Sequence, residues 1–415
     1  MKFLYKHTSS WQDIFILILI LSQLTKADRR VLDGKDPTHN RNYVVYFIKA
    51  DDSIQYDAWL CGGAIVSPWY ILTSAACMED VKHMYAIAGY RNYVHYELLN
   101  EDRCANYTKR KIIFKCLPRD YQFDYPRVER WANIDLALVK VEKPYDFSDN
   151  SYLNHHCSYI PNKIDINYDI KLQEAGTDAI VFGWGHVQKW REMNDTLDYN
   201  QDFLLYGSVK LAPKQECMEH FDNGIFRSII EKYMICSLDE GNINDAGDII
   251  RDYDGPENYA VDCGPGALRI GDKCLYLRQF TRKRGICQND HGGPIITWRG
   301  PKEVLIGISS VFRVENGTQN CVPPFLYTST HCNGEFIHCL MNTAEDGNMG
   351  EEDTRRCDKL AKRSGFNIVR RTISWIGHPD GPAYNEIQAN SHNKEYKTAN
   401  SIVKIRHQIP IRGRS

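Results

Sequence analysis

Two neighbouring blocks near the start of the chain decide its fold: Cys61-Gly-Gly-Ala-Ile-Val-Ser-Pro68 and Ile71-Leu-Thr-Ser-Ala-Ala-Cys77. Each is a short apolar run bounded by small or turn-forming residues, and together they indicate a strand-turn-strand unit. Elsewhere the chain is dominated by short β-branched and aromatic runs broken by Gly, Pro and Asn. This pattern predicts an antiparallel all-β fold.

Four further blocks follow in order along the chain: Asn133–Val139 (NIDLALV), Phe182–Gly185 (FGWG), Cys287–Pro294 (CQNDHGGP) and Gly307–Ser310 (GISS). The order and spacing of all six blocks closely resemble the chymotrypsin/trypsin family of serine proteases, over residues 31–377 with insertions. The resemblance implies two antiparallel six-stranded β-barrels, an active site in the cleft between them and a short C-terminal helix. We assign that helix to Ile368–Ile376, with Trp375 and Ile376 packing inward.

Two of the three catalytic positions of that family are substituted in this chain. Peptide hydrolysis by the family needs a Ser nucleophile, a His base and an Asp that orients the His. The position of the base holds Ala76, and a methyl group cannot accept a proton. The position of the nucleophile holds His291, whereas the orienting carboxylate is present as Asp135. We therefore expect a peptidase homologue that is not an enzyme.

The groups that bind substrate in the family are also changed. The oxyanion hole of the family uses the backbone N–H of a Gly, and Asn289 matches that position. The base of the specificity pocket matches Gly285, which offers no carboxylate to a Lys or Arg substrate. The two wall positions match Phe312 and Phe325, so phenyl rings are expected to fill the pocket. Ordinary core packing of the two Phe residues leads to the same expectation.

The sequence Arg30-Val31-Leu-Asp-Gly34 resembles the activation site of the family. There, cleavage releases a new N-terminus that pairs with the Asp before the nucleophile, which is Asp290 in this chain. The resemblance implies cleavage between Arg30 and Val31. The alternative is that Arg29 and Arg30 form an ordinary basic pair on the surface.

The first 27 residues have the pattern of a secretory signal peptide. Basic residues precede the apolar run Ile14–Leu21, and the small residues Thr25 and Ala27 follow it. Cleavage after Ala27 leaves a propeptide of residues 28–30. A membrane anchor and a buried core helix are the alternatives, but the run is shorter than the ~20 apolar residues that span a bilayer. We expect a secreted, extracellular protein without a membrane anchor.

The chain has 14 cysteines, an even number that predicts a disulfide framework in an exported protein. The resemblance suggests the bridges Cys61–Cys77, Cys217–Cys236 and Cys287–Cys321, and Cys157–Cys332 as a further one. Cysteines in longer segments are paired with their neighbours, as Cys104–Cys116, Cys263–Cys274 and Cys339–Cys357. No Cys/His pattern has the spacing of zinc ligands, so no metal is expected. Glycosylation sequons begin at Asn106, Asn194 and Asn316.

Three charged or polar segments lie outside these blocks. Residues 237–262 form an acidic insertion, interpreted as a solvated loop in preference to a calcium loop. Residues 278–284 are basic and are interpreted as a solvated loop, with an acidic partner or a proteolytic site as alternatives. Residues 378–415 are polar and predicted to be mostly disordered, with residues 402–409 as a candidate docking strand.

The leading functional prediction is a secreted, non-catalytic protease homologue that binds other proteins. The resemblance implies a cofactor, decoy or regulator in an extracellular protease cascade of the immune or clotting type, with active proteases or their zymogens as candidate partners. One alternative is a hydrolase with a rewired site that uses Asp135 and His291. Another is a structural or secretory-fluid protein of a gland, venom or seminal fluid. The net charge of -2 gives no reason to expect nucleic-acid binding, and no cofactor is expected.

The retained Asp135 raises a question about its hydrogen bonds. In the family its partners are the catalytic His and a Ser that matches Ser310. With Ala76 in place of the His, we expect the His291 ring to enter the space and donate to Asp135, directly or through one water, with a raised pKa. The alternative leaves the His291 ring in solvent.

Overall fold

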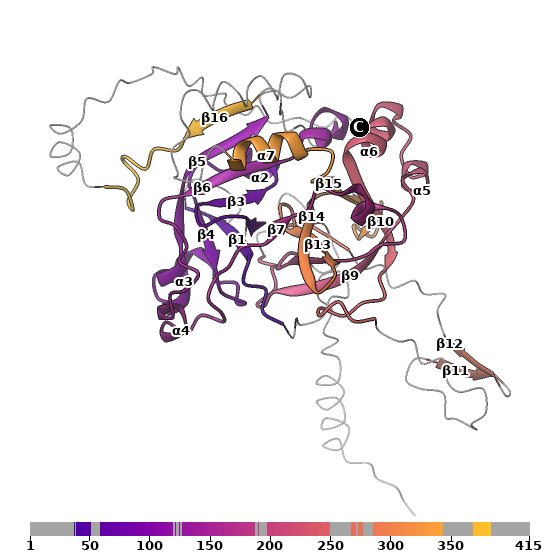
Figure 1. Ribbon diagram of the computed structural model, residues 1–415, viewed down its shortest axis with the longest axis horizontal. Helices are drawn as coiled ribbons and strands as arrows, with labels where there is room; N and C mark the ends of the chain where they lie inside the picture. Colours follow the sequence, from indigo (N-terminus) through magenta and orange to yellow (C-terminus); the bar gives the residue numbers. More distant parts are fainter. Residues whose placement is uncertain are drawn as a thin grey trace, which may run out of the picture. The chain divides into compact units, whose positions relative to one another are not determined.

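The computed structural model describes residues 37, 39–50, 59–118, 121, 124, 127–186, 190, 197–249, 267–270, 273–276, 285–342 and 368–382 (Figure 1). The chain divides into two units, Met1–Ile373 and Ser374–Ser415. The predicted signal peptide and propeptide, Val31, Asn194, the basic residues 278–284 and the tail beyond residue 382 lie outside the described residues.

The first barrel is closed and contains six antiparallel strands. They are, in sheet order, β1 (Val44–Lys49), β2 (Leu60–Ile65), β3 (Tyr70–Thr73), β6 (Ala137–Val141), β5 (Arg110–Pro118) and β4 (Met84–Ala88). Strand β5 closes the barrel because it pairs with both β4 and β6. In β1 to β4 every residue is buried, as expected of strands that line a closed core.

The second barrel is built in the same way. Its strands are β8 (Asp178–Gly183), β9 (Leu205–Leu211), β10 (Met234–Glu240), β15 (Cys321–Ser329), β14 (Lys302–Val314) and β13 (Pro294–Arg299). A two-residue strand, β7 (Asp165–Ile166), lies parallel to the start of β14. Val181, Leu205, Ile295 and Phe325 belong to the buried core of this barrel. The expected fold of two six-stranded antiparallel barrels is therefore confirmed.

Short helices and one hairpin connect or flank the strands. The α-helices are α2 (Ala75–Asp80), α3 (Arg103–Thr108), α4 (Ser151–Asn154), α5 (Lys214–Glu219), α6 (Gly224–Tyr233) and α7 (Gly334–Asn342). The 3-10 turns are η1 (Tyr96–Leu98), η2 (Val128–Arg130), η3 (Ala132–Ile134) and η4 (Ile170–Gln173). Strands β11 (Ala267–Ile270) and β12 (Lys273–Tyr276) form a separate hairpin.

The prediction of a helix at Ile368–Ile376 is wrong. Residues 368–372 form strand β16 (Ile368–Thr372), which pairs with the end of β5 in antiparallel register (Figure 1). The β-branched residues of this segment favour a strand, and β4 pairs only with the first residues of β5, so the rest of that edge is available. The C-terminal helix is α7, which follows β15. In the second unit, Trp375 is buried but Ile376 is 60% exposed.

Three of the expected disulfides are present: Cys61–Cys77, Cys217–Cys236 and Cys287–Cys321. The structure also joins Cys104 to Cys157, so the expected pairs Cys104–Cys116 and Cys157–Cys332 are both wrong. This bridge ties α3 to the residues after α4, two segments with no counterpart in the six blocks. Within the described residues Cys332 forms no disulfide. The pairs Cys263–Cys274 and Cys339–Cys357 are not tested, because Cys263 and Cys357 lie outside the described residues.

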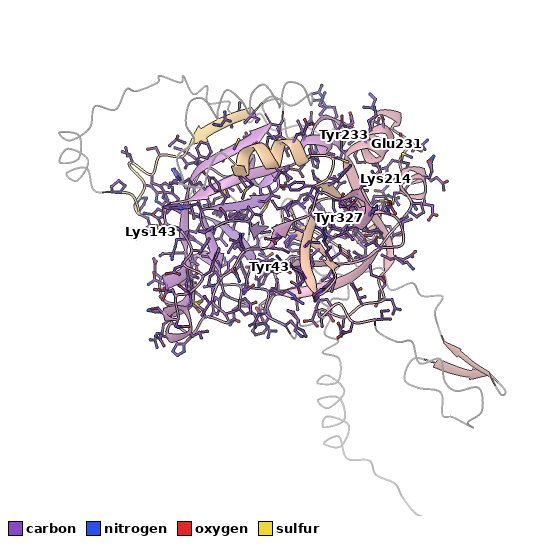
Figure 2. The ribbon with its side chains drawn as sticks, viewed as in Figure 1. Tyr43, Lys143, Lys214, Glu231, Tyr233 and Tyr327 are labelled. Atoms are coloured by element: carbon purple, nitrogen blue, oxygen red, sulfur yellow. A yellow bond between two sulfur atoms is a disulfide. The ribbon has the colours of Figure 1, made fainter. Side chains whose placement is uncertain are left out.

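A buried Arg joins the first strand region to the second barrel. The Arg41 guanidinium is 2% exposed and lies 2.5 Å from Glu303 and 3.6 Å from Asp245. The Tyr43 hydroxyl, labelled in Figure 2, donates a 2.8 Å hydrogen bond to the same Glu303 carboxylate. Asp245 belongs to the acidic insertion, so this part of the insertion is not the solvated loop that we expected.

Candidate functional site

The carboxylate of Asp135 lies at the centre of the site and is completely buried. Its Oδ1 accepts hydrogen bonds from the Ser74 hydroxyl at 2.6 Å and from the backbone N–H of Ala76 at 2.9 Å. Its Oδ2 accepts from the Ser310 hydroxyl at 2.5 Å. Three donors therefore satisfy this carboxylate without the His291 ring.

Local structure explains why Ser74 is available to Asp135. Ser74 is the N-cap of α2, and its Oγ also accepts from the Ala76 N–H at 3.1 Å. A Ser at an N-cap satisfies backbone donors at the start of a helix. The same hydroxyl donates its proton to Asp135, so the start of α2 and the carboxylate form one hydrogen-bonded unit. Ser310 comes from β14 on the second barrel, so the carboxylate links both barrels.

The His291 residue is held by its backbone in the loop before β13. Its carbonyl oxygen accepts from the Gly62 N–H at 2.7 Å, and its ring is edge-on to Phe312 with the centroids 5.7 Å apart. A side chain at Gly62 would lie 2.6 Å from the Gly293 Cα, so only Gly allows this close approach of β2. The loop is therefore packed directly against the first barrel.

The pKa of His291 is lowered, opposite to the direction that we expected. Burial lowers it, and the Asp135 carboxylate and the Ser310 carbonyl only partly offset that effect. Within the described residues no hydrogen bond joins the His291 ring to Asp135, whose bonds are made with Ser74, Ala76 and Ser310. Of the two expected arrangements, the direct hydrogen bond is therefore not formed, and a contact with Asp135 through one water stays a prediction. The lowered pKa leaves the imidazole neutral at neutral pH.

Asn289, at the oxyanion position, has a left-handed backbone with a φ of 72°. Asn tolerates this region better than most residues with a Cβ. Its amide nitrogen donates to Asn200 Oδ1 at 2.7 Å and lies 3.4 Å from His186 Nε2. The His186 ring is itself edge-on to Tyr199, with the centroids 5.4 Å apart. The partners of Asn289 were missed because they lie in segments without a recognisable sequence signal.

Asp290 is a second buried carboxylate, 1% exposed. It accepts hydrogen bonds from the backbone N–H groups of Gly185 at 2.9 Å and Cys287 at 3.0 Å. Burial raises the pKa of Asp290 to about 7, although these two hydrogen bonds oppose the shift. No cation of the described residues forms an ion pair with Asp290. Val31, whose new N-terminus is its expected partner, and Arg30 of the expected cleavage site lie outside the described residues.

Aromatic rings pack around the residues that the sequence places at the specificity pocket. A Cβ on Gly285 would lie 2.1 Å from the Phe325 ring, and Phe325 is completely buried in the core of the second barrel. Phe312 is half-buried, and its ring lies 5.9 Å from the Trp190 ring, measured between centroids. The structure thus brings Phe325 against Gly285, and Phe312 against both His291 and the core that contains Phe325. Trp190 was not predicted as part of this group.

The comparisons with known proteins agree with this architecture. The family model described as Trypsin matches residues 34–248, and the chain belongs to the trypsin family. Vitamin K-dependent protein C of Oryctolagus cuniculus is 24% identical over 233 residues, which cover 55% of this chain and 43% of the relative.

Two other relatives are similar to a comparable extent. Thrombin-like enzyme 2 of Trimeresurus albolabris is 28% identical over 176 residues, which cover 41% of this chain and 55% of the relative. Coagulation factor XI of Bos taurus is 27% identical over 213 residues, covering 51% of this chain and 29% of the relative. The chain therefore spans about half or less of the length of these relatives.

Three further observations concern the part of the chain that the structure describes. It contains no group of three or more His, Cys, Asp or Glu side chains able to hold a metal ion. None of its helices has the length and apolar character needed to cross a membrane. Asn106 and Asn316, two of the three sequon residues, are exposed.

Proposed function

We propose that this protein is a non-catalytic member of the trypsin family that acts by binding other proteins. The main support is the hydrogen bonding of Asp135, which accepts from Ser74, the Ala76 N–H and Ser310. In a working triad this carboxylate holds a His ring, and the ring takes a proton from a Ser. Here a methyl group stands at the base position, and the neutral His291 ring stands at the nucleophile position.

The filled pocket region supports the same proposal. Phe325 packs against Gly285, and Phe312 packs against both Trp190 and His291. A substrate side chain would have to displace these rings. Loss of the nucleophile, of the base and of the pocket together leaves a protein surface as the functional part of the molecule.

We place this activity outside the cell, as a cofactor, decoy or regulator of a protease cascade, with proteases or their zymogens as partners. The disulfides and the signal-peptide pattern support export. The names of the relatives, which include protein C and coagulation factor XI, make a cascade the first place to look for partners.

A labelling experiment tests the lack of catalysis. The secreted chain, with an active trypsin as positive control, is treated with a fluorophosphonate probe and with peptide esters. We expect no labelling and no turnover above the buffer rate. Turnover that disappears in the His291→Ala variant would instead support a rewired hydrolase.

A capture experiment tests the binding role. The immobilised secreted chain is incubated with fluid from the tissue that secretes it, and active-site-blocked trypsin serves as a matched control for the fold. We expect a protease or a zymogen to be retained by this chain and not by the control. Retention of neither class would reject the cascade role and favour a structural component of that fluid.

A further inference from the structure

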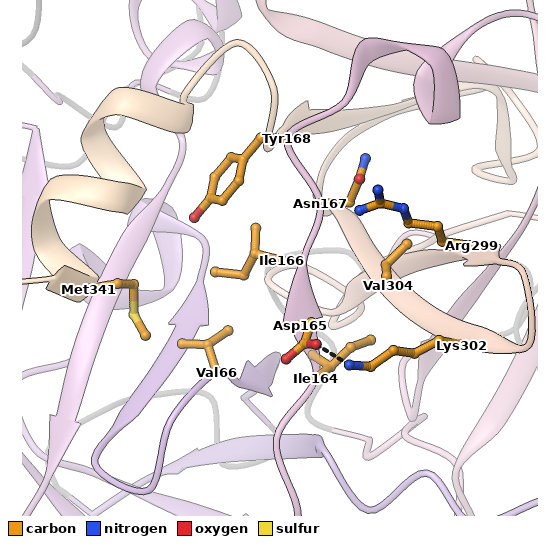
Figure 3. Close-up of a pocket in the computed structure, with 10 residues that line it drawn as sticks. All are labelled: Val66, Ile164, Asp165, Ile166, Asn167, Tyr168, Arg299, Lys302, Val304 and Met341. Carbon is orange, nitrogen blue, oxygen red and sulfur yellow. Dashed lines mark hydrogen bonds and ion pairs between the residues drawn. The ribbon is translucent and has the colours of Figure 1, made fainter. Parts of the chain in front are cut away.

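A pocket with a volume of about 400 Å³ lies at the opposite end of the β13–β14 hairpin from His291 (Figure 3). Strand β13 runs from Pro294, beside the His291 loop, to Arg299, and β14 returns from Lys302 toward Ser310. The nine residues from Lys302 to Ser310 span about 25 Å in an extended strand. The pocket is therefore separate from the site around Asp135.

Half of the residues that line the pocket are apolar, and the others, Asp165, Asn167, Tyr168, Arg299 and Lys302, are polar. The apolar residues come from the end of β2, the segment around β7, the start of β14 and α7, and are Val66, Ile164, Ile166, Val304 and Met341. Figure 3 shows Ile166, Val66 and Met341 around the same space as the Tyr168 ring. Burial raises the pKa of Tyr168 to about 12, so its hydroxyl is uncharged at neutral pH. This part of the pocket suits an apolar chain.

The rim of the pocket carries an excess positive charge. Asp165 and Lys302 form an ion pair with each other, drawn as a dashed line in Figure 3, so their charges cancel. Arg299 lines the same pocket, is exposed, and forms no ion pair with any other residue that the structure describes. An Arg guanidinium binds a carboxylate through two parallel hydrogen bonds. Arg299 is thus the side chain at the rim that can bind an anion.

We propose that this pocket binds a small amphipathic carboxylate, with its carboxylate on Arg299 and its apolar chain against Ile166 and Met341. A volume of about 400 Å³ is within the range of ~300–1,000 Å³ typical of ligand sites. The apolar lining residues, together with one uncompensated cation at the rim, suit a chain that ends in one negative charge. This proposal does not depend on the lack of catalysis, because the pocket shares no residue with the Asp135 site.

Calorimetry with the full secreted chain tests the proposal. The probes are decanoate and its neutral counterpart decanol. We expect saturable binding of one decanoate, and binding of decanol about tenfold weaker, because one exposed charge-assisted contact is worth about a factor of ten. Arg299→Gln should weaken decanoate about tenfold and leave decanol unchanged, whereas Lys163→Gln, an exposed cation outside the pocket, should change neither.

A second variant tests the location of the apolar chain. Ile166→Trp places a larger side chain in the pocket and should abolish binding of both probes, with the fold checked by circular dichroism. The proposal is overturned if decanoate does not bind saturably, if Arg299→Gln leaves its affinity unchanged, or if folded Ile166→Trp still binds it.

Discussion

Ser74 Oγ lies 2.6 Å from Asp135 Oδ1, and this hydrogen bond joins the start of α2 to the buried carboxylate. The residue two positions later, Ala76, adds its backbone N–H to the same oxygen. The carboxylate therefore forms part of the helix N-terminus, where a negative charge is favoured by the helix dipole and by exposed N–H groups. Asp135 thus has a structural role at the start of α2.

Restoring the two missing catalytic side chains should not restore a good protease. In the double variant Ala76→His and His291→Ser, the aromatic rings of Phe312 and Phe325 would still obstruct the pocket region. We expect peptide-ester turnover at least about a hundredfold below that of an active trypsin, since lost positioning alone costs this much. Turnover within tenfold of trypsin would show that the rings do not block substrate.

Removal of the Ser74 hydroxyl should destabilise the fold. Ser74→Ala loses the bond to Asp135 and the N-cap of α2, at a cost of about 1–3 kcal/mol in the free energy of unfolding. Urea denaturation measures the difference. The matched control is Ser148→Ala, which removes an exposed hydroxyl that bonds only to Asp146, and which should cost less than about 0.5 kcal/mol. Equal losses in both variants would contradict the structural role of Ser74.

The lowered pKa of His291 predicts a stability that falls in mild acid. Below the unfolded pKa of about 6.5 the unfolded state binds a proton that the folded state does not, so this part of the stability is lost as the pH falls toward the folded pKa. NMR titration of the His ring protons, with His291→Gln used to assign the signal, measures the folded value. A midpoint above 6.5 would reverse the sign and contradict the prediction.

The raised pKa of Asp290 predicts the opposite trend. Its folded value of about 7 lies above the unfolded value of about 3.9, so the group lowers stability as the pH rises through this interval. Asp290→Asn should therefore gain stability over the parent chain by about 2–4 kcal/mol at pH 8, and little at pH 4. The parent chain and the Asp290→Asn variant both also carry Arg30→Gln, because cleavage after Arg30 would release an N-terminus that pairs with Asp290. If the parent chain were more stable than the Asp290→Asn variant at pH 8, an unpaired Asp290 would be ruled out.

The bridge between Cys104 and Cys157 can be tested directly. Peptide mapping without reduction should find these two cysteines in one linked pair. Replacing both by Ala opens a loop of 53 residues and should lower the free energy of unfolding by about 4 kcal/mol. A linked peptide that contains Cys104 and Cys116 would instead support the pairing of neighbours.

The fold was predictable because its signals are local sequence blocks in a fixed order. Asp135 and Ser310 fall within two of these blocks, so their proximity could also be predicted from the sequence. The role of the Ser74 hydroxyl could not be predicted, because it depends on the exact start of α2. The sign of the His291 pKa shift depends on the balance between burial and the Asp135 charge, and only coordinates supply that balance.

The errors lie in segments without counterparts in the blocks. Cys104 and Cys157 are in such segments, and separation along the sequence does not determine which cysteines meet. The sequence of Ile368–Ile376 predicts a helix, but an available edge of β5 makes Ile368–Thr372 a strand, and sequence alone does not show that edge.

The pairing of β16 with β5 has a consequence for biosynthesis. Ile368 lies opposite Pro118, so the partner of this edge emerges from the ribosome about 250 residues later than the edge itself. Until then the end of β5 presents unpaired backbone groups, which are a template for pairing with other chains. A nascent or truncated chain that lacks residues 368–372 should depend on chaperones far more than the finished molecule does, and secretory quality control should retain it.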